Sequence, residues 1–288
     1  MKMRTRNRFA TAAVALAFAM SAMAGSALAA PAKAKAPQPA AVKGEIQPKA
    51  VDLLKAMSDA IGHAKTLGFD VISTYESPSR YGPPLAYKTM SHVALQRPDK
   101  LKVVTTADGP PTEFYYDGKT MMSFAVQENL VAMADAPPTV DQTLEALYKT
   151  SGTYFPFADF LVSDPYADMA KSLTLAFYIG QSNVVGGVTT DMVAYESEGV
   201  FVQVWIGADD KLPRMARAIF FDDPMRLRHQ VEISNWKLDA PMKPEEFTSA
   251  KAAGASKIPF EHPSTHQAPA AAHAGSGKPA TKPASAAH

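Results

Sequence analysis

The sequence predicts an α+β fold, in which a large antiparallel sheet curls over helices on one side. Three observations lead to this expectation. A single amphipathic helix comes first, and a long series of segments with a hydrophobic period of two follows it. Short turn sequences separate most of these segments, and a helical stretch interrupts the series between residues 139 and 172. Strands in a run, with helices at one end and in the middle, are typical of α+β rather than parallel α/β proteins.

The first helix is expected after Pro48. Apolar residues recur there at spacings of three and four, which places them on one face of a helix: Val51, Leu54, Met57, Ile61 and Ala64. From Leu67 onward the hydrophobic period changes to two, and we expect the sheet to begin there.

About eleven strands follow. The first six are expected over residues 69–77, 87–96, 100–106, 112–116, 119–125 and 129–134, and five more over 173–181, 188–197, 199–207, 214–221 and 227–238. The short connections predict antiparallel pairing. Asp117-Gly118 suits a tight hairpin turn, because glycine tolerates a positive φ angle. Pro98 cannot donate to a strand ladder and indicates a strand start or a sheet edge.

The interruption at residues 139–172 predicts helices within the sheet series. Thr139 is expected to cap a helix over 140–149, with further helical turns at 157–161 and 166–172. Segment 200–206 is apolar on both sides, with Phe201 and Trp205 on one of them, so the strand should be covered twice. A sheet that curls over helices explains this pattern. Whether the helices fill the concave side as a core or leave a cavity stays open.

The N-terminus has the features of an export signal. Four basic residues within the first eight precede an apolar run from Phe9 to Met20, and small residues follow as far as Ala29. We expect residues 1–29 to be a signal peptide that is cleaved after Ala29. The apolar run is short for a membrane span and no second one follows, so no transmembrane segment is expected in the mature chain. The chain has no cysteine, which excludes disulfides, a thiolate nucleophile and an acylated cysteine.

Two segments are expected to be flexible. Residues 30–47 are rich in Ala, Pro and Lys, and residues 261–288 are rich in Ala, Pro and His, so neither can bury enough apolar surface to order itself. A single domain is expected between them, over residues 48–260. Four of the seven histidines lie in the C-terminal tail, but their spacing is irregular and no carboxylate or cysteine accompanies them. We therefore expect a tether there and no metal site.

The charge balance argues against a nucleic-acid partner. Once the predicted signal is removed, 25 basic residues remain against 28 acidic ones, and residues 46–260 hold 20 basic and 26 acidic residues. Nucleic-acid binding calls for a clustered basic face, which this composition does not favour. A polybasic patch for a membrane surface is disfavoured for the same reason.

The motifs also argue against an enzyme, and no cofactor is expected. The sequence contains no Gly-x-Ser-x-Gly elbow, no His-Glu-x-x-His and no phosphate-binding glycine loop. The acidic pairs Asp209-Asp210 and Asp222-Asp223 fall in predicted turns, where turn chemistry explains them. His63, His92 and His229 are scattered over a helix and two strands. A hydrolase would need one of them to meet a carboxylate inside a pocket, and that alternative stays open.

Six short segments, in this order, support a family resemblance: Arg97-Pro98-Asp99-Lys100-Leu101, Tyr115-Tyr116-Asp117-Gly118-Lys119-Thr120, Trp205-Ile206-Gly207, Asp209-Asp210-Lys211-Leu212-Pro213-Arg214, Asn235-Trp236-Lys237 and Pro244-Glu245-Glu246-Phe247. Together with the first helix they resemble the predicted periplasmic proteins of the DUF2092 type. More broadly, the order is similar to the superfamily of the outer-membrane lipoprotein carrier and of mycobacterial lipid-carrying lipoproteins. The resemblance implies a periplasmic location and an unclosed β-barrel of about eleven strands around a hydrophobic hollow, with helices as a lid.

The resemblance further implies a non-catalytic binding protein, and a carrier among its roles, for a lipid, a lipoprotein acyl chain or another hydrophobic ligand. Because large apolar residues are usually buried, each of the cavity-lining candidates is on its own more often a core residue than a ligand contact. They are Phe114, Tyr116, Met121, Phe124, Phe201 and Trp205 from the strands, and Phe155, Phe157, Phe160 and Leu161 from the insertion. Arg97 matches an arginine that holds the lid of the carrier closed. It is the candidate lid latch, with donors that suit carbonyl oxygens of the insertion, and the alternative is an exposed residue at the start of a strand.

One further function class shares this fold. Periplasmic regulators of envelope stress use it to detect misplaced lipoproteins, so the alternative is a sensor or interaction module with an envelope protein as partner. The protein is expected to be a monomer in either case.

Overall fold

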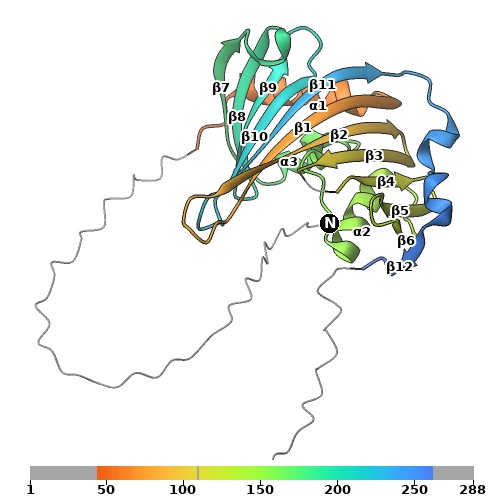
Figure 1. Ribbon diagram of the computed structural model, residues 1–288. Coiled ribbons are helices and arrows are strands. Elements are labelled where there is room, and N and C mark those ends of the chain that lie inside the picture. The colour runs from red at the N-terminus through yellow and green to blue at the C-terminus, as the bar shows by residue number, and fades with distance from the viewer. Residues whose placement is uncertain (1–43, 109, 262–288) are drawn as a thin grey trace, which may run out of the picture.

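The computed structural model describes residues 44–108 and 110–261 (Figure 1). The predicted signal peptide, most of the linker after it and all but the first residue of the C-terminal tail lie outside the described residues. One sheet of twelve strands forms the centre of the fold, in the order β12-β6-β5-β4-β3-β2-β1-β11-β10-β9-β8-β7. All neighbours in it are antiparallel except β12 and β6.

The strands are β1 (Thr66–Ser77), β2 (Leu85–Gln96), β3 (Lys100–Ala107), β4 (Thr112–Tyr116), β5 (Thr120–Ala125), β6 (Leu130–Asp135), β7 (Leu173–Ser182), β8 (Thr190–Ser197), β9 (Val200–Gly207), β10 (Pro213–Phe220), β11 (Arg228–Leu238) and β12 (Ser256–Ile258). The helices are α1 (Pro48–Gly62), α2 (Val140–Ser151) and α3 (Pro165–Ala170). Four short 3-10 turns complete the set: η1 (Ala158–Phe160), η2 (Val185–Gly187), η3 (Pro244–Phe247) and η4 (Lys251–Gly254).

The predicted α+β class and the eleven predicted strands are confirmed. The twelfth strand, β12, was not predicted, and because it runs parallel to β6 the sheet is mixed rather than purely antiparallel. The side chains of β12 are all exposed, so no alternation of buried and exposed residues marks it in the sequence. Among the described strands, the edge strands β12 and β7 do not pair with each other, and the sheet is an unclosed barrel.

The sheet curves, and the helices lie on its concave side (Figure 1). The main hydrophobic core fills this side. Leu54, Met57 and Ile61 of α1 are buried in it together with Leu144 and Leu147 of α2 and apolar residues of β1–β4. The amphipathic patterns of both helices thus face the sheet, which is where their apolar burial stabilises the fold.

The insertion, residues 139–172, begins at the cap that its sequence predicts. The side chain of Thr139 caps α2 by accepting a hydrogen bond from the amide of Gln142. Gly152 ends α2 in the left-handed conformation. Asp164 caps α3 through its contact with the amide of Ala167, and Pro165 occupies the first turn.

A second, smaller core lies on the convex face. The C-terminal strap, residues 244–258, crosses β4–β6 there and covers Tyr115, Met122, Phe124 and Val131. Beneath it the buried carboxylate of Glu113 accepts a hydrogen bond from the Tyr115 hydroxyl at 2.9 Å. Burial, followed by this carboxylate, raises the pKa of Tyr115 to about 12. Strands β4–β6 are therefore covered on both faces.

The Asp117-Gly118 turn joins β4 to β5 as predicted. Asp117 Oδ1 accepts hydrogen bonds from the amides of Lys119 and Thr120, at 3.0 and 2.8 Å. Gly118 has a φ of 96°, and a Cβ added to it would lie 2.7 Å from Asp99 Oδ2. The position therefore favours glycine on two grounds, its backbone conformation and its close neighbour.

We predict that Gly118→Ala destabilises the protein by at least about 1–2 kcal/mol, since a side chain is unfavourable at positive φ and meets Asp99. Gly254→Ala is the matched control, because nothing lies within 4 Å of its added Cβ. Urea unfolding of both variants measures the difference. Equal free energies of unfolding would show that the turn tolerates a side chain.

Candidate ligand-binding site on the concave face

The concave face is apolar at the end that lies next to Arg97. Cross-strand neighbours form a fully buried row over five strands: Leu67, Leu95, Leu101, Tyr116 and Met121. A second row lies beside it and is also buried: Phe69, Val93, Val103 and Phe114. Period-two alternation brings these residues to one face, and the antiparallel register aligns them.

The insertion covers this apolar end through aromatic contacts. The ring of Phe157 lies edge-on to Phe69 at 6.0 Å, and Phe155 lies edge-on to Phe114 at 5.6 Å. Phe155 and Phe157 stack on each other at 5.6 Å. Offset and edge-on pairs of this kind stabilise packing beyond their buried area, so the insertion is seated specifically on β1 and β4.

Arg97 fastens the insertion to the sheet. Its two terminal nitrogens donate to the carbonyl oxygens of Leu161 and Val162, at 3.0 and 2.9 Å. Its Nε is buried and has no hydrogen-bond partner among the described residues. Burial lowers the pKa of the Arg97 guanidinium, against the opposite effect of the nearby Asp141 carboxylate. Two charge-assisted bonds to backbone carbonyls hold this segment in a defined place.

Neighbouring contacts reinforce the same junction. The amide of Val140 donates to the carbonyl of Pro98 at 2.8 Å, which ties the start of α2 to the residue after Arg97. The Asp141 carboxylate accepts from both the amide and the hydroxyl of Ser163. The insertion is therefore closed on itself and attached to the sheet beside the β2–β3 connection.

Away from Arg97, the concave face becomes polar. The hydroxyls of Ser91 and Thr105 form a hydrogen bond at 2.8 Å. Ser73 is 1% exposed, and its hydroxyl has no hydrogen-bond partner among the described residues. Its neighbours in the register are Val231 and Thr89. A buried hydroxyl without a partner is unfavourable, and in this structure the Ser73 oxygen is closed to solvent.

A row of rings follows on the same face, one step nearer the β1–β2 turn. Tyr87 stacks on Tyr75 at 5.8 Å, His229 lies edge-on to Tyr75 at 6.3 Å, and Phe220 lies edge-on to His229 at 5.0 Å. Burial lowers the pKa of His229, which favours the neutral imidazole. The four rings are partly exposed, and they line the open end of the concave face.

Three titratable side chains of the insertion and of β8 lie near one another. Tyr154 is 46% exposed and Asp159 is also exposed, whereas Tyr195 on β8 is half-buried. Burial raises the pKa of all three groups, and the Asp159 carboxylate raises those of both tyrosines further. The surface of these side chains thus stays partly open where the insertion meets β8.

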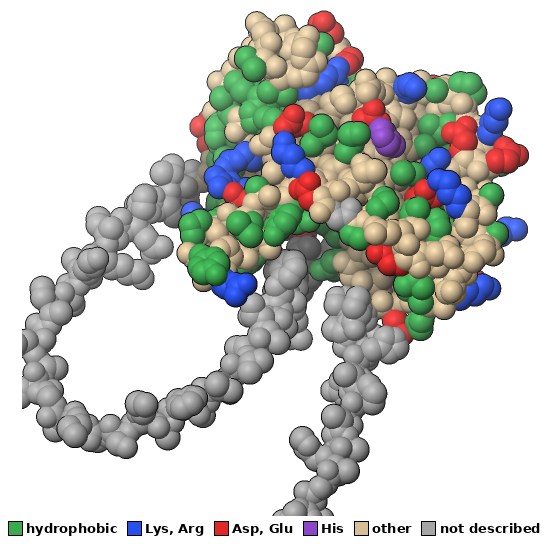
Figure 2. Space-filling model, in the orientation of Figure 1, with side chains coloured by type: hydrophobic (Ala, Val, Ile, Leu, Met, Phe, Trp, Pro, Cys, Tyr) green, Lys and Arg blue, Asp and Glu red, His purple; other side chains and the backbone are tan. Residues whose placement is uncertain are grey.

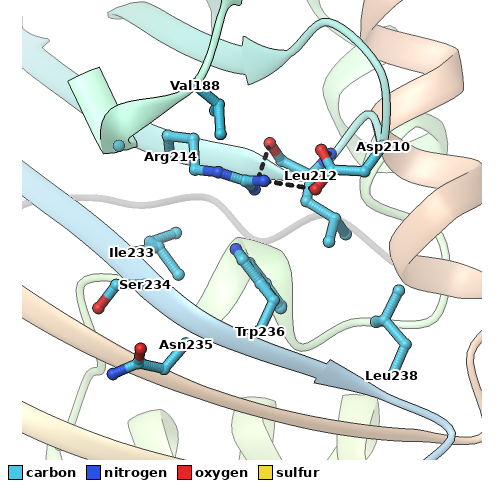
Figure 3. Close-up of a pocket in the computed structure, with 10 residues that line it drawn as sticks. Val188, Asp210, Leu212, Arg214, Ile233, Ser234, Asn235, Trp236 and Leu238 are labelled. Carbon is cyan, nitrogen blue, oxygen red and sulfur yellow. Dashed lines mark hydrogen bonds and ion pairs between the residues drawn. The ribbon is translucent and has the colours of Figure 1, made fainter. Parts of the chain in front are cut away.

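A separate pocket of about 510 Å³ lies between η2 and strands β10 and β11 (Figure 3). Its polar wall is already hydrogen-bonded internally: Arg214 donates to the carbonyl of Leu212 at 3.1 Å and pairs with Asp210. The indole of Trp236 donates to the carbonyl of Pro213 at 3.0 Å. The other wall is apolar and consists of Val188, Leu212, Ile233, Trp236 and Leu238. The pocket thus presents polar and apolar surface in similar amounts.

Most of the candidate cavity residues lie on the concave side. Phe114, Tyr116 and Met121 are buried there, and the insertion residues pack against them: Phe155, Phe157, Phe160 and Leu161. Their role toward a ligand stays a prediction.

Three candidates lie elsewhere, which corrects their predicted placement. Phe124 belongs to the convex core beneath the C-terminal strap. Phe201 and Trp205 alternate along β9 with Val204 and Ile206, which are core residues of the concave face. Large apolar side chains were assigned to the cavity for their type alone, and a strap on the convex face was not expected. Ser73, Tyr75 and Tyr87 were missed, although the β1–β2 register places them beside the core.

The arrangement that a hydrolase needs is not assembled in the described part of the chain. His92 Nδ1 does meet a carboxylate, Asp70 Oδ1, at 2.5 Å, and Asn235 donates to the other oxygen at 2.6 Å. His92 lies on the convex face, however, with 55% of its side chain exposed, and not in a pocket. Asp223 accepts from the amides of Met225 and Leu227 within its turn, as predicted.

Residues 44–108 and 110–261 hold no cluster of three or more His, Cys, Asp or Glu side chains that could bind a metal ion. A helix long and apolar enough to span a membrane is likewise absent from these residues.

The comparison with protein families decides the assignment. A family model described as a predicted periplasmic protein (DUF2092) matches residues 50–261. The chain belongs to this family. It is thus a periplasmic protein, as predicted, and its fold is the unclosed barrel that the resemblance implied. None of the curated proteins matches this chain.

Three solved structures that are similar to this DUF2092 protein are described here, and each shares 17% identity or less with it. LprF from Mycobacterium bovis is 17% identical, with 69% of this chain and 97% of that chain covered and a TM-score of 0.39. MucB in the MucA/MucB complex of Pseudomonas aeruginosa is 14% identical, with 73% and 64% covered and a TM-score of 0.38. A putative outer membrane lipoprotein-sorting protein domain from Vibrio parahaemolyticus is 8% identical, with 69% and 96% covered and a TM-score of 0.34. The chain spans less than two thirds of the length of the MucB chains that it resembles.

We predict opposite effects for two serines of this face. Ser73→Ala should leave the free energy of unfolding unchanged or raise it, because its hydroxyl is buried without a partner. Ser91→Ala should lower it by about 1 kcal/mol, because the hydrogen bond to Thr105 is lost. Urea unfolding of the ligand-free protein measures both. A loss of equal size for Ser73→Ala would mean that its hydroxyl is satisfied in solution.

Proposed function

We propose that this protein is a non-catalytic periplasmic binding protein for a lipid, an acyl chain or another hydrophobic ligand. The observation that carries the proposal is an apolar surface that strands β9 and β10 leave partly exposed on the concave face: Val200, Val202, Ala216 and Ala218. A partly exposed apolar surface within a curved sheet is the kind of surface that an acyl chain covers.

The chemistry of the face suits an amphiphile. Each methylene that leaves water on burial contributes about 0.8 kcal/mol, so a chain of moderate length binds without any covalent step. The partly exposed ring row from Tyr87 to Phe220 can meet a more polar part of the ligand. We infer that a ligand lies with its apolar part toward the insertion and its polar part toward the ring row.

The insertion acts as a lid in this proposal, and Arg97 as its latch. The carbonyls of Leu161 and Val162 accept from the guanidinium and follow directly after η1, which packs on the core. Breaking these two bonds frees the middle of the insertion while α2 stays capped at both ends. The aromatic side chains of the insertion would then exchange contacts with the sheet for contacts with a ligand.

The first test is native mass spectrometry of the mature protein, purified from the periplasm under mild conditions, followed by organic extraction. A mass increment that resolves to an acyl lipid supports the proposal and identifies the ligand class. An unmodified mass that stays unchanged after incubation with lipid vesicles contradicts it.

We predict that Val202→Trp weakens binding of a dansyl-labelled fatty acid by at least about tenfold, because the indole occupies space on the concave face. Gln203→Trp is the matched control, since the next residue of β9 points to the convex face. Fluorescence titration measures both affinities. Equal binding by the two variants would place the ligand elsewhere.

We predict that Arg97→Leu loosens the insertion and raises the amount of lipid that copurifies. Two carbonyls lose their donors, so amide hydrogen exchange over residues 157–170 should accelerate by about tenfold or more. Arg217→Leu, which removes an arginine from the convex face of β10, is the control. Unchanged exchange together with unchanged lipid content would exclude the latch.

A sensor or protein-interaction module is the second candidate. The edge strand β7 favours it, because residues 45–47 pair with β7 only around Ala176 and Tyr178, and the strand continues along the sheet edge to Ser182. Edge strands can accept an extended segment of a partner. MucB has been solved in complex with MucA. A stable protein partner, combined with a ligand-free mass, would favour this candidate.

A further inference from the structure

The β1–β2 hairpin projects beyond its neighbours in the sheet (Figure 1). On one side β3 ends at Ala107, opposite Thr89, and on the other side the pairing with β11 ends at Tyr75 and His229. Within the described sheet, the strand residues between 76 and 87 therefore pair only with each other. The far end of this hairpin stands out from the molecule.

The end of the hairpin exposes large apolar side chains. Tyr81 is 83% exposed and Leu85 is 52% exposed, while Pro83 and Pro84 lie between them. The adjacent turn between β10 and β11 adds Phe221 and Met225, which are 39% and 42% exposed. We call these two segments, residues 78–87 and 221–226, the docking tip. A group of exposed apolar residues at one end of a molecule indicates an interaction surface.

The turn of the hairpin is held in shape by its own contacts. The Tyr81 amide donates to the Ser79 hydroxyl at 3.0 Å, and the Gly82 amide donates to the Ser79 carbonyl at 3.2 Å. The prolines restrict the backbone further. The turn therefore presents Tyr81 to solvent in a defined conformation and loses little conformational entropy on binding.

Two of the three exposed rings of the docking tip, those of Tyr81 and Phe221, have an arginine beside them. The guanidinium of Arg80 lies 5.4 Å from the centre of the Tyr81 ring, and that of Arg226 lies 5.4 Å from the Phe221 ring. The charges of this region balance. Glu76 pairs with Arg228, and the turn that holds Arg226 also contains Asp222 and Asp223. Figure 2 shows hydrophobic side chains together with a Lys or Arg side chain at the hairpin end, at the lower left of the folded part.

We propose that the docking tip binds the interfacial region of a phospholipid bilayer. Rings combined with arginines suit this region, because the ring enters the headgroup level and the long cationic side chain reaches the water. A narrow projecting end penetrates such an interface, whereas a specific protein interface usually needs about 800 Å² on each partner. The balanced charge indicates that apolar contact, rather than attraction to anionic lipid, supplies the affinity.

The docking tip also lies beside the proposed ligand site, and its role there rests on the proposed function. Tyr87 belongs to the hairpin and stacks on Tyr75, the second ring of the row on the concave face. From the docking tip the ring row leads through His229 to Phe220. A bilayer bound at the docking tip would therefore lie next to the open end of the ligand site. A lipid could pass between them without crossing free water.

The test is flotation of the full mature chain with phosphatidylcholine vesicles, with and without phosphatidylglycerol. The double variant Tyr81→Ser/Leu85→Ser should lower the partition coefficient by at least about tenfold. Val184→Ser is the matched control and should change it little, because Val184 is 87% exposed but lies in the β7–β8 loop at the opposite end of the sheet. Phosphatidylglycerol should have a small effect. In a second measurement, Tyr81→Trp should shift its emission to shorter wavelength on vesicles.

The outcomes separate this inference from the proposed function. Vesicle binding that survives the double variant, or a wild-type chain that does not bind vesicles, overturns the docking tip even if lipid copurifies. A wild-type chain that floats but carries no lipid upholds the docking tip and contradicts the ligand site. Capture of a stable protein partner through Tyr81, without vesicle binding, also overturns the inference. Both variants alter exposed residues, and equal urea midpoints confirm that they fold.

Discussion

The two hydrogen bonds from Arg97 to the carbonyl oxygens of Leu161 and Val162 determine where the insertion lies on the sheet. A curved sheet with an apolar concave face must be covered, because the rows that begin at Leu67 and Phe69 would otherwise meet water. Aromatic contacts could cover these rows in several positions, since they are only weakly directional. The guanidinium accepts few geometries, and it therefore fixes the insertion at the apolar end.

This placement leaves the rest of the concave face less covered. The insertion is attached beside the β2–β3 connection, and its far part reaches the end of β8, where the Ser197 hydroxyl donates to the carbonyl of Met169. The hydroxyls of β1–β3 and the ring row lie beyond it, toward the hairpin. Along the concave face, the residues thus change from buried and apolar near Arg97 to partly exposed, polar and aromatic near the hairpin. This change follows from the attachment of the insertion at the Arg97 end. The convex face shows the opposite arrangement, since the C-terminal strap covers β4–β6 and leaves the Asp70–His92 pair in solvent.

Local signals in the sequence predict most of the fold. The strands are predictable because two signals are visible within a few residues. One is the alternation of buried and exposed residues, and the other is the turn between strands, as at Asp117-Gly118. The contact of Arg97 with the insertion was expected only from the family resemblance. Phe124, Phe201 and Trp205 were misplaced because their type is the same on either face, and only the register and the covering elements decide which face is inward. β12 was missed because backbone pairing alone creates it. The unpartnered hydroxyl of Ser73 is a property of the whole packing, which no sequence pattern marks.

Arg97 and the ring row lie at different ends of one surface, and this separation constrains the proposed function. Under that proposal, a ligand that enters at the hairpin end would first meet rings, which need no movement of the insertion to accept it. Only a longer apolar part would reach the aromatic side chains of the insertion and compete with their contacts to Phe69 and Phe114. The free energy to release the Arg97 bonds would then come from methylenes buried at that end. In the proposed function, occupancy and the position of the insertion would therefore be coupled through chain length, so that short amphiphiles would bind with the insertion closed and long ones would open it.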